Sequence, residues 1–520
     1  MKVLILGGGS AGWMTAAYMA KRGANLDITL LESSDVPIVG VGEATIPTIK
    51  RFNDRLGLTE KDWMPACNAS YKFAIRFKDW HHKGADYWHP FESIPYFHPQ
   101  HHLAHYWYGN QLEQENWMGR GDLDNSDFYS SLFVGVDMMK NNQILKNPED
   151  PEKFIVYQVS GTETEKSVQS LPHAYHFDAG LYGEYLKTSV AIPNGVDHIV
   201  DHVEKVERAE DGNIAALHTR SGQRLEADLF VDCTGFASLL IEQELEVPFD
   251  SFSESLFCDR AVAMRLPFED QKNEQYPYTV SGAMDAGWSW RIGLTNRIGT
   301  GYVYSSRHID EQQAEVELRN YLGAERCENL DARHLKMRVG KSSQTWAKNC
   351  VAIGLSAGFV EPLESTGLEL IQQGVERLTD ALSRGDINAA TRAAYNQCMT
   401  GLFEEVRDFI VLHYALSARE DTQFWRDVKN ETVVSDKLGS LLADWKHFWP
   451  NQFEGKIFGE TSWMCVLNGM GMFPTIDRYE RMPPQELQQQ LVHLQQMDNV
   501  RKGLGQIACD HYEYLLKMKS

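Results

Sequence analysis

The chain has 520 residues, more than one ordinary domain requires, so we expect a large cofactor-binding body with an attached second lobe. Its 43% hydrophobic and 23% charged residues are typical of a globular protein and exclude a disordered chain. A net charge of -22 disfavours nucleic acid and anionic membranes as partners. The eight cysteines form no CxxC pair, which predicts reduced thiols and no metal site. Without a signal peptide or a membrane-spanning run, a cytoplasmic protein is expected.

The first 32 residues have the pattern of a strand, a tight turn, a helix and a second strand. The apolar run from Val3 to Leu6 leads into a turn with GxGxxG spacing at Gly7, Gly9 and Gly12. Such glycines let helix amides approach a pyrophosphate, and Glu32 ends the next strand, where a ribose hydroxyl needs an acceptor. The pattern predicts a bound dinucleotide; the alternative is a glycine turn without a ligand.

A second strand and glycine turn, VAIGLSAGFVEPLESTG, lies far downstream and favours FAD over NAD as the dinucleotide. We find no second GxGxxG for a nicotinamide nucleotide, because Gly469 and Gly471 lack the third glycine and the following helix. The residues predicted to contact FAD in these two regions are Gly7, Gly9, Ser10, Ala11, Gly12, Glu32, Leu355 and Gly367.

Thr366 and Glu369 have capping-box spacing just before an apolar run at helical period. The free amides of a first helical turn, together with the helix dipole, favour a small anion. Thr366 and Gly367 are therefore candidate halide ligands. The alternative is an ordinary helix cap.

The chain is predicted to divide into a discontinuous FAD-binding domain and a substrate lobe. The FAD-binding domain covers 1–80 and 160–375; an aromatic-rich insertion covers 81–159, and a helical C-terminal lobe covers 376–520. The fold class expected is α/β, with an FAD-binding Rossmann-type domain like that of flavoprotein monooxygenases and a mostly α-helical substrate lobe.

Several blocks of the sequence resemble those of the flavin-dependent tryptophan halogenases. They run from Gly7 to Trp425 in the family's order, so the resemblance covers most of the chain. The blocks are GGGSAGW, GVGEATIP, NASYKFAIRF, YHFDA, DLFVDCTGF, GTGYVYSS, FVEPLESTG, RDFI and DTQFW.

The resemblance implies that reduced FAD, oxygen and chloride or bromide give hypohalous acid, which a lysine then delivers to an aromatic ring in a separate chamber. Lys72 matches that lysine, and Glu364 matches the family's second essential residue. From the residues alone, alternation along 71–80 makes Lys72 a solvated strand face, and Glu364 is a polar residue at a helix start. The block GVGEATIP resembles a strap over the flavin, with cofactor contacts at Val41, Gly42, Glu43 and Ala44.

Trp288 and Trp290 match the family's W-x-W-x-I-P block, which is taken to wall off the flavin from direct substrate approach. Gly293 stands here in place of the proline. The departure leaves both tryptophans intact and makes the following loop harder to predict.

Candidate substrate contacts are aromatic. His89 and Phe91 match a pair that sandwiches the indole ring, and Phe458 lies in a comparable position, with core aromatics as the alternative for each. In tryptophan-binding members, a Tyr-Tyr pair binds the amino-acid group of the substrate. The corresponding residues here are His447-Phe448, with Glu454 as the candidate carboxylate. The substrate can therefore be tryptophan, indole or a larger arene.

Two other functions remain open at this point. One is an aromatic hydroxylase that uses NAD(P)H directly, and the other is a flavin-binding protein without catalysis. Because no nicotinamide site is visible, a separate flavin reductase is expected to supply reduced FAD. A homodimer is favoured over a monomer by the resemblance.

Overall fold

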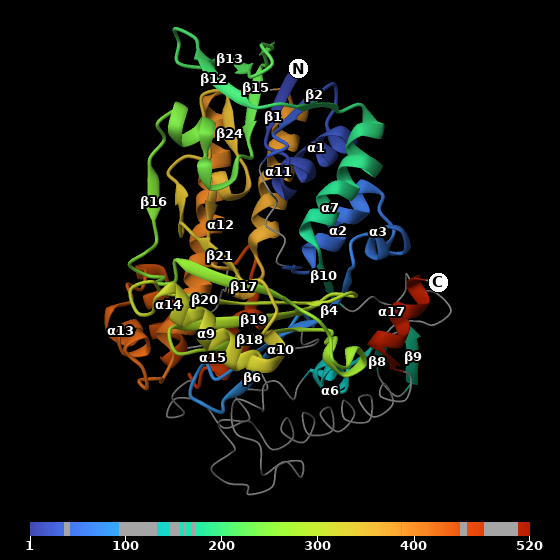
Figure 1. The fold of residues 1–520 in the computed structure, drawn as a ribbon, viewed down its shortest axis with the longest axis vertical. Helices are drawn as coiled ribbons and strands as arrows, with labels where there is room; N and C mark the ends of the chain where they lie inside the picture. Colours follow the sequence, from blue (N-terminus) through green and yellow to red (C-terminus); the bar gives the residue numbers. More distant parts are fainter. Residues whose placement is uncertain are drawn as a thin grey trace, which may run out of the picture. The chain divides into compact units, whose positions relative to one another are not determined.

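The structure is a computed structural model and describes residues 1–35, 42–92, 133–145, 156–160, 163–167, 172–385, 387–447, 455–472 and 508–519 (Figure 1). Residue contacts divide the chain into two compact units. Unit 1 comprises Met1–Ser70, Ala174–Pro267 and Leu294–Arg407, and unit 2 comprises Tyr71–His173, Phe268–Gly293 and Asp408–Ser520. The boundaries of these units differ from those of the predicted domains. The predicted division into a cofactor domain and a substrate lobe concerns ligand binding and stays a prediction.

Unit 1 is built on a mainly parallel sheet of six strands in the order β11-β2-β1-β15-β24-β23. The first five strands run parallel, and β23 pairs antiparallel with β24. The apolar run predicted as the first strand is buried throughout, as expected for the centre of a parallel sheet. The strands are β1 (Lys2–Leu6), β2 (Asp27–Glu32), β11 (Asp197–Val200), β15 (Leu229–Asp232), β23 (Trp346–Ala347) and β24 (Cys350–Ala352).

Helix α1 (Ser10–Arg22) packs against α7 (Ala179–Leu186) and α11 (Gly367–Ser383). The apolar stripe predicted along the helix after Gly367 is confirmed, because Leu368, Ile371, Val375, Leu378 and Leu382 are all buried. Further helices are α2 (Thr48–Leu56), α3 (Glu60–Ala66), α9 (Glu311–Leu322), α10 (Ala324–Cys327) and the long α12 (Ala389–Ala415).

Unit 1 also carries further groups of antiparallel strands. They contain β3 (Glu43–Ala44) with β10 (Ala174–Phe177), β12 (Val203–Arg208) with β13 (Ile214–Thr219) and β14 (Arg224–Leu225), β16 (Phe249–Ser251) with β22 (Gly340–Ser342) and β25 (Gly358–Phe359), and β17 (Arg260–Leu266) with β20 (Ile298–Tyr304) and β21 (Arg333–Lys336).

Unit 2 contains strands as well as helices, so it is not purely helical. The order β19-β18-β5-β6 joins β19 (Gly287–Gly293), β18 (Thr279–Ala283), β5 (Ala74–Lys78) and β6 (Asp86–Pro90). The pair β18-β5 is parallel and the other two pairs are antiparallel. The remaining elements are β4 (Ser70–Lys72), which begins at the boundary of the units, α6 (Val134–Lys140), β7 (Gln143–Ile144), β8 (Val156–Ser160), β9 (Glu163–Ser167), α8 (Gln271–Glu274), α13 (Gln423–Glu431), α14 (Asp436–His447), α15 (Glu460–Gly469), β26 (Cys509–Asp510) and α17 (His511–Lys519). The chain is mixed α/β, as the sequence predicts.

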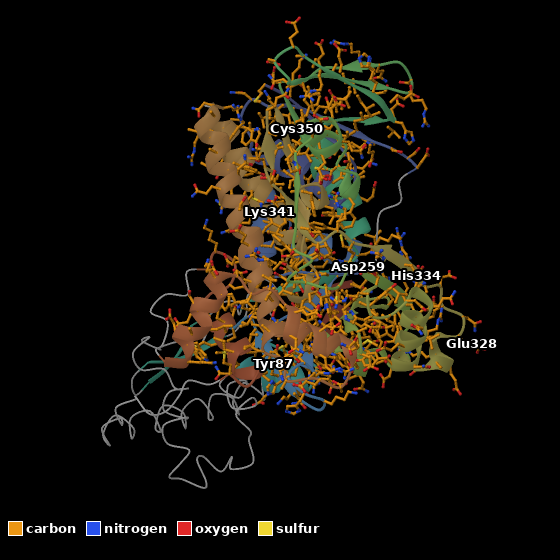
Figure 2. The ribbon with its side chains drawn as sticks, turned by 90° about the vertical axis from the view of Figure 1, so that its left-hand side faces the viewer. Tyr87, Asp259, Glu328, His334, Lys341 and Cys350 are labelled. Carbon is orange, nitrogen blue, oxygen red and sulfur yellow. The ribbon has the colours of Figure 1, made fainter. Side chains whose placement is uncertain are left out.

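All eight cysteines are free thiols, and most of them are buried. Cys350 lies on β24 in the main sheet of unit 1 (Figure 2), where burial raises the pKa of its thiol well above the usual range. Burial likewise raises the pKa of Cys67 to about 12. Such thiols stay protonated and pack as small apolar groups. Over the ranges described above, no helix is long and apolar enough to cross a membrane.

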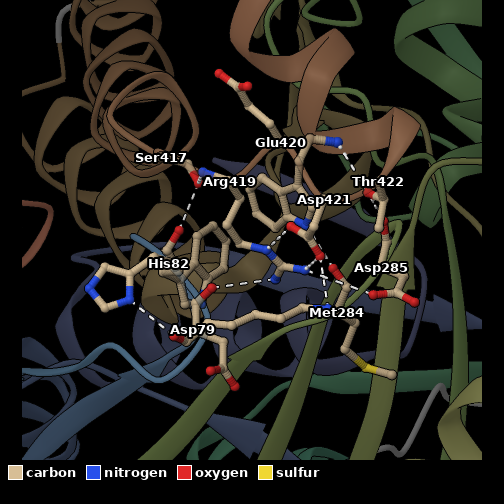
Figure 3. A network of polar contacts seen from close by, with 12 residues as sticks. Asp79, His82, Met284, Asp285, Ser417, Arg419, Glu420, Asp421 and Thr422 are labelled. Atoms are coloured by element: carbon tan, nitrogen blue, oxygen red, sulfur yellow. Dashed lines mark hydrogen bonds and ion pairs between the residues drawn. The ribbon is translucent and has the colours of Figure 1, made fainter.

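Unit 2 holds an ion-pair network around Arg419 (Figure 3). The buried guanidinium donates two hydrogen bonds of 2.9 Å to the Asp421 carboxylate and lies 4.6 Å from the Trp425 ring centroid. It also donates to the backbone carbonyl of Asp79, 3.4 Å away. The hydrogen bonds from Arg419 hold the pKa of Asp421 well below its usual range. The DTQFW block therefore ties the loop after α12 to the turn between β5 and β6.

Candidate active site

The glycine-rich turn after β1 is required by close backbone approaches within unit 1. Gly7 has φ +112°, its N–H donates to Leu31 O at 2.8 Å, and a Cβ there would lie 2.3 Å from Cys233 O. A Cβ on Gly12 would lie 1.8 Å from Gly7 O. No other residue fits either position without moving the backbone.

The N-terminus of α1 has space in front of it. Its N-cap is Gly9, no side chain in the described ranges caps it, and its first turn carries no acid. A Cβ added to Gly9 would meet no atom within 4 Å. The Ser10 hydroxyl lies 3.3 Å from Ala179 O, so it is turned toward α7. An open, uncapped helix start of this kind fits a dinucleotide pyrophosphate.

Glu32, the predicted ribose acceptor, lies against this turn. A Cβ on Gly8 would be 1.4 Å from Glu32 Oε2, so the carboxylate occupies the space beside that glycine. Its other oxygen, Oε1, lies 2.8 Å from His198 Nε2 and 3.4 Å from Lys187 Nζ. The sequence did not indicate these two neighbours, because they come from segments more than 150 positions away with no motif of their own.

Leu355 is brought next to α1 by the turn η7 (Gly354–Ser356). Gly354 has φ +77°, and a Cβ on it would lie 2.7 Å from the Cβ of Ala11. Leu355 itself is 38% exposed, which is unusual for a leucine beside a buried sheet. Two predicted cofactor residues, Ala11 and Leu355, are therefore on neighbouring turns.

Asp232 organises this end of the sheet and was missed by the sequence reasoning. Fully buried at the end of β15, its carboxylate accepts hydrogen bonds from the N–H groups of Leu240 and Ile241 at 2.8 and 2.9 Å. It also accepts from Ser356 Oγ at 3.1 Å, next to Leu355. An acid at the carboxyl end of a parallel strand is the signal that could have identified it.

The strap residues lie beside the start of α11. Val41 is outside the described residues, whereas Gly42 has φ +86° and Glu43 and Ala44 form β3, which pairs with β10. A Cβ on Gly367 would be 3.9 Å from Glu43 Oε1. Glu43 and Gly367, predicted separately, are thus close neighbours in unit 1.

The predicted capping box at the start of α11 does not form. Glu369 instead accepts hydrogen bonds from the Thr48 hydroxyl and from Gln373 Nε2, the latter at 2.7 Å. Thr366 makes no side-chain cap, and its buried Oγ1 has no hydrogen-bond partner among the residues that the structure describes. Burial raises the pKa of Glu369, which favours its neutral form near this helix start. A buried hydroxyl and first-turn amides fit a small anion better than they fit an ordinary cap.

Glu364 is not an exposed polar residue at a helix start. It ends the turn η8 (Pro362–Glu364) and is 1% exposed. Ser365, with φ +60°, then reverses the chain into α11. A buried carboxyl and a left-handed serine are unfavourable features that are common at functional sites.

Lys72 lies in unit 2 and is 0% exposed, so the alternative of a solvated strand face is wrong. The predicted continuous strand is two short strands, β4 and β5, which break at Phe73, whose N–H donates to Pro277 O at 2.9 Å. Alternation failed as a guide because residues on both sides of the strand are buried. The Lys72 ammonium lies 5.1 Å from the centroid of the Phe91 ring, a cation–π contact.

The other aromatic candidates of unit 2 form one cluster. His89 and Phe458 are each 3% exposed, with ring centroids 6.5 Å apart. Phe409, from the RDFI block, stacks on Phe458 at 3.8 Å and lies 5.9 Å from His89. The sequence assigned no role to Phe409. Glu454 and Phe448 lie outside the described residues, as does the side chain of His447.

The two tryptophans of the family's wall block are buried on β19, with ring centroids 6.3 Å apart. A Cβ on Gly293 would lie 3.3 Å from Gln275 Cα and from Tyr276 N. The close approach of this segment explains why a small residue is accommodated where the family has proline.

A family model described as tryptophan halogenase matches residues 2–484. The tryptophan 6-halogenase SttH of Streptomyces toxytricini is 40% identical over 485 residues, which cover 90% of this chain and 89% of that protein. The 7-chloro-L-tryptophan 6-halogenase KtzR of Kutzneria sp. (strain 744) is 36% identical over 99% of each chain.

Solved structures agree with these matches. The crystal structure of SttH superposes with a TM-score of 0.87 over 99% of each chain, and identity over that longer alignment is 35%. Xcc4156, a flavin-dependent halogenase from Xanthomonas campestris, gives a TM-score of 0.85 at 33% identity, over 99% of this chain and 98% of that one. The chain therefore belongs to the tryptophan halogenase family and is a flavin-dependent halogenase.

Proposed function

We propose that this enzyme places chlorine or bromine on an electron-rich aromatic ring of the indole type, with tryptophan or indole as the substrate. The observation that carries this proposal is Lys72, a fully buried ammonium against the Phe91 ring, in a unit that also holds the aromatic cluster of His89, Phe409 and Phe458. Burying a charged side chain costs free energy unless it is paired and hydrogen-bonded.

Unit 1 supplies the cofactor site in this proposal, as an FAD-binding Rossmann-type domain. The open start of α1 would hold the pyrophosphate, Glu32 the ribose, and the turn at Leu355 with the strap at Gly42 to Ala44 the remainder of FAD. When bound, reduced FAD supplies with oxygen the oxidising power that converts halide to hypohalous acid. Thr366 and Gly367 would hold the halide, because a buried hydroxyl donor and amides of the first turn of α11 face no competing cap.

The two catalytic residues have separate roles. The Lys72 ammonium would donate a hydrogen bond to hypohalous acid and orient its halogen toward the ring. The ring carbon then bonds to halogen, hydroxide leaves the halogen, and the displaced aryl proton goes to a base. Glu364 would accept that proton as a buried carboxylate.

The substrate site would use His89, Phe91 and Phe458, whose faces suit any flat, electron-rich arene. Glu454 is proposed as the contact for a substrate amine. Because His447-Phe448 stand in place of the two tyrosines, plain indole is an alternative substrate to tryptophan. SttH and KtzR act on tryptophans by name.

A separate flavin reductase would supply reduced FAD, and we place both proteins in the cytoplasm. A homodimer is included in the proposal on the family resemblance. Efficient oxidation of NADH by the purified chain alone would contradict dependence on a reductase.

The test is an incubation of the purified chain with FAD, a flavin reductase, NADH and chloride or bromide, with tryptophan and indole offered separately. Mass spectrometry should show the halogen isotope pattern in one of the two arenes. An oxygenated product without halogen would favour a hydroxylase, and no product from either arene would point first to a larger arene as the substrate.

A further inference from the structure

The strand that carries Lys72 has an unusual hydrogen-bond partner in unit 2. Strands β5 and β18 pair in parallel, with Thr279 opposite Ile75. The same register continues two residues toward the N-terminus, where Phe73 N–H donates to Pro277 O at 2.9 Å. By that register, the next bond of the ladder would join Tyr71 N–H directly to Gln275 O.

An imidazole takes the place of that bond. His511 Nε2 lies 3.3 Å from Tyr71 N, and His511 Nδ1 lies 3.1 Å from Gln275 O. Since the Tyr71 amide can only donate, Nε2 must accept; the proton is therefore on Nδ1, which donates to the Gln275 carbonyl. The neutral Nδ1–H tautomer of His511 thus continues the ladder across a wider gap.

His511 comes from the last helix of the chain, which is held in place by several contacts. Its N–H donates to Asn142 O at 2.9 Å, and just before it β26 pairs with β7. Lys272 Nζ reaches Glu513 at 3.0 Å, and the Tyr514 ring packs 6.0 Å from the Tyr71 ring. The imidazole itself is 0% exposed.

We propose that His511 is a positioning residue for Lys72: its imidazole fixes Tyr71 as Pro277 fixes Phe73, so the backbone at Lys72 is held from both sides. This inference rests on the proposed role of Lys72 in delivering halogen. Without the His511 contact, the amine would lose its fixed position, and a displacement of about 1 Å at a reacting group can cost about 100-fold in rate.

Two substitutions distinguish the two hydrogen bonds that the His511 imidazole makes. Glutamine is long enough to place an amide oxygen where Nε2 accepts from Tyr71, whereas the shorter asparagine can replace only Nδ1 as the donor to Gln275. Free hypohalous acid is trapped with a diketone that it halogenates, and ring-halogenated arene is measured in parallel. We expect His511→Asn to keep hypohalous acid within about twofold of wild type and to lower ring halogenation at least tenfold, and His511→Gln to restore most of it.

A second measurement does not depend on activity. Hydrogen exchange of the peptide that contains Tyr71 should be at least tenfold faster in His511→Asn than in wild type, with His511→Gln between them. Tyr395→Phe is the matched control, because it removes a buried hydrogen bond of 3.3 Å to Gly374 O in unit 1 and should leave the ratio of the two products unchanged.

An asparagine variant with the wild-type product ratio would overturn the proposal, as would hypohalous acid and halogenated arene falling together. If wild type produces hypohalous acid but halogenates neither arene, the proposed substrate class fails, and unchanged exchange at Tyr71 in the asparagine variant would overturn the positioning role separately.

Discussion

The glycine-rich turn of unit 1 and the Lys72 strand of unit 2 represent two ways of building a functional site. Most of the turn comes from the first 32 residues, in which Gly12 lies against Gly7 and Glu32 lies beside Gly8, with Cys233 as one distant neighbour of Gly7. The Lys72 strand is held by segments near positions 91, 277 and 511. The first arrangement is mainly local and is set by steric limits on the backbone, whereas the second depends on long-range packing throughout.

This difference separates two outputs that an assay can measure. A defect in the turn should reduce cofactor binding and with it everything that follows. A defect around Lys72 should reduce ring halogenation and spare the release of hypohalous acid. Changes at the two sites should therefore be distinguishable by comparing hypohalous acid with halogenated arene.

The largest effect is expected for Lys72→Ala. Ring halogenation should fall at least about 1000-fold, equivalent to about 4 kcal/mol, while FAD binding and flavin oxidation stay near wild type. The reason is that the lysine acts after hypohalous acid has formed. Product is measured by mass spectrometry and flavin oxidation by absorbance.

Two variants control for this truncation. Lys72→Met retains most of the buried volume and should be as inactive as the alanine variant. Lys78→Ala removes another lysine, at the end of β5, and should remain active. Substantial ring halogenation by Lys72→Met would show that the charge at this site is dispensable.

Gly12→Ala should affect both outputs together. The new Cβ would meet Gly7 O at 1.8 Å, so the turn must shift away from the cofactor. We expect the Kd for FAD to rise at least about tenfold, a loss of about 1.4 kcal/mol, measured by fluorescence titration. Gly401→Ala is the matched control, since a Cβ there would meet no atom within 4 Å. Equal FAD affinity in the two variants would contradict the tight turn.

The His511 imidazole should make stability depend on pH. Burial lowers its pKa to about 4, against the opposing effects of the Gln275 carbonyl and Asp510. Because the unfolded chain binds this proton near pH 6.5 and the folded chain does not, the stabilisation is complete above pH 6.5 and is lost as pH falls toward 4. At pH 5 the loss is about 2 kcal/mol.

Urea unfolding at pH 7 and pH 5 measures that loss, with His511→Gln as the variant that cannot titrate. The glutamine variant should be less stable at pH 7 and should lose less between the two pH values. An identical loss in both proteins would show that folding does not lower the pKa of His511.

The same contrast explains what the sequence could predict. Steric rules operate between near neighbours, so the turn at Gly7 to Gly12, the parallel strands and the α11 stripe followed from spacing. The burial of Lys72 could not be derived from alternation, because it depends on residues packed against both sides of its strand. Asp232 and His511 were assigned no role, since most of their partners are backbone groups whose positions only the fold determines.

Thr366→Val gives the clearest distinction between a halide ligand and a helix cap. Loss of a cap would destabilise the protein by about 1 kcal/mol. Here the hydroxyl makes no cap and is buried, so valine should leave the unfolding free energy unchanged or raise it slightly. The KM for halide should instead rise about tenfold, since a hydrogen bond to a charged group contributes about 1.5–3 kcal/mol. Thr366→Ser, which retains the hydroxyl, should keep the wild-type KM. A destabilised valine variant with a normal KM for halide would show that Thr366 has a structural role and is no halide ligand. The start of α11 would then share its uncapped geometry with α1 but would bind no anion.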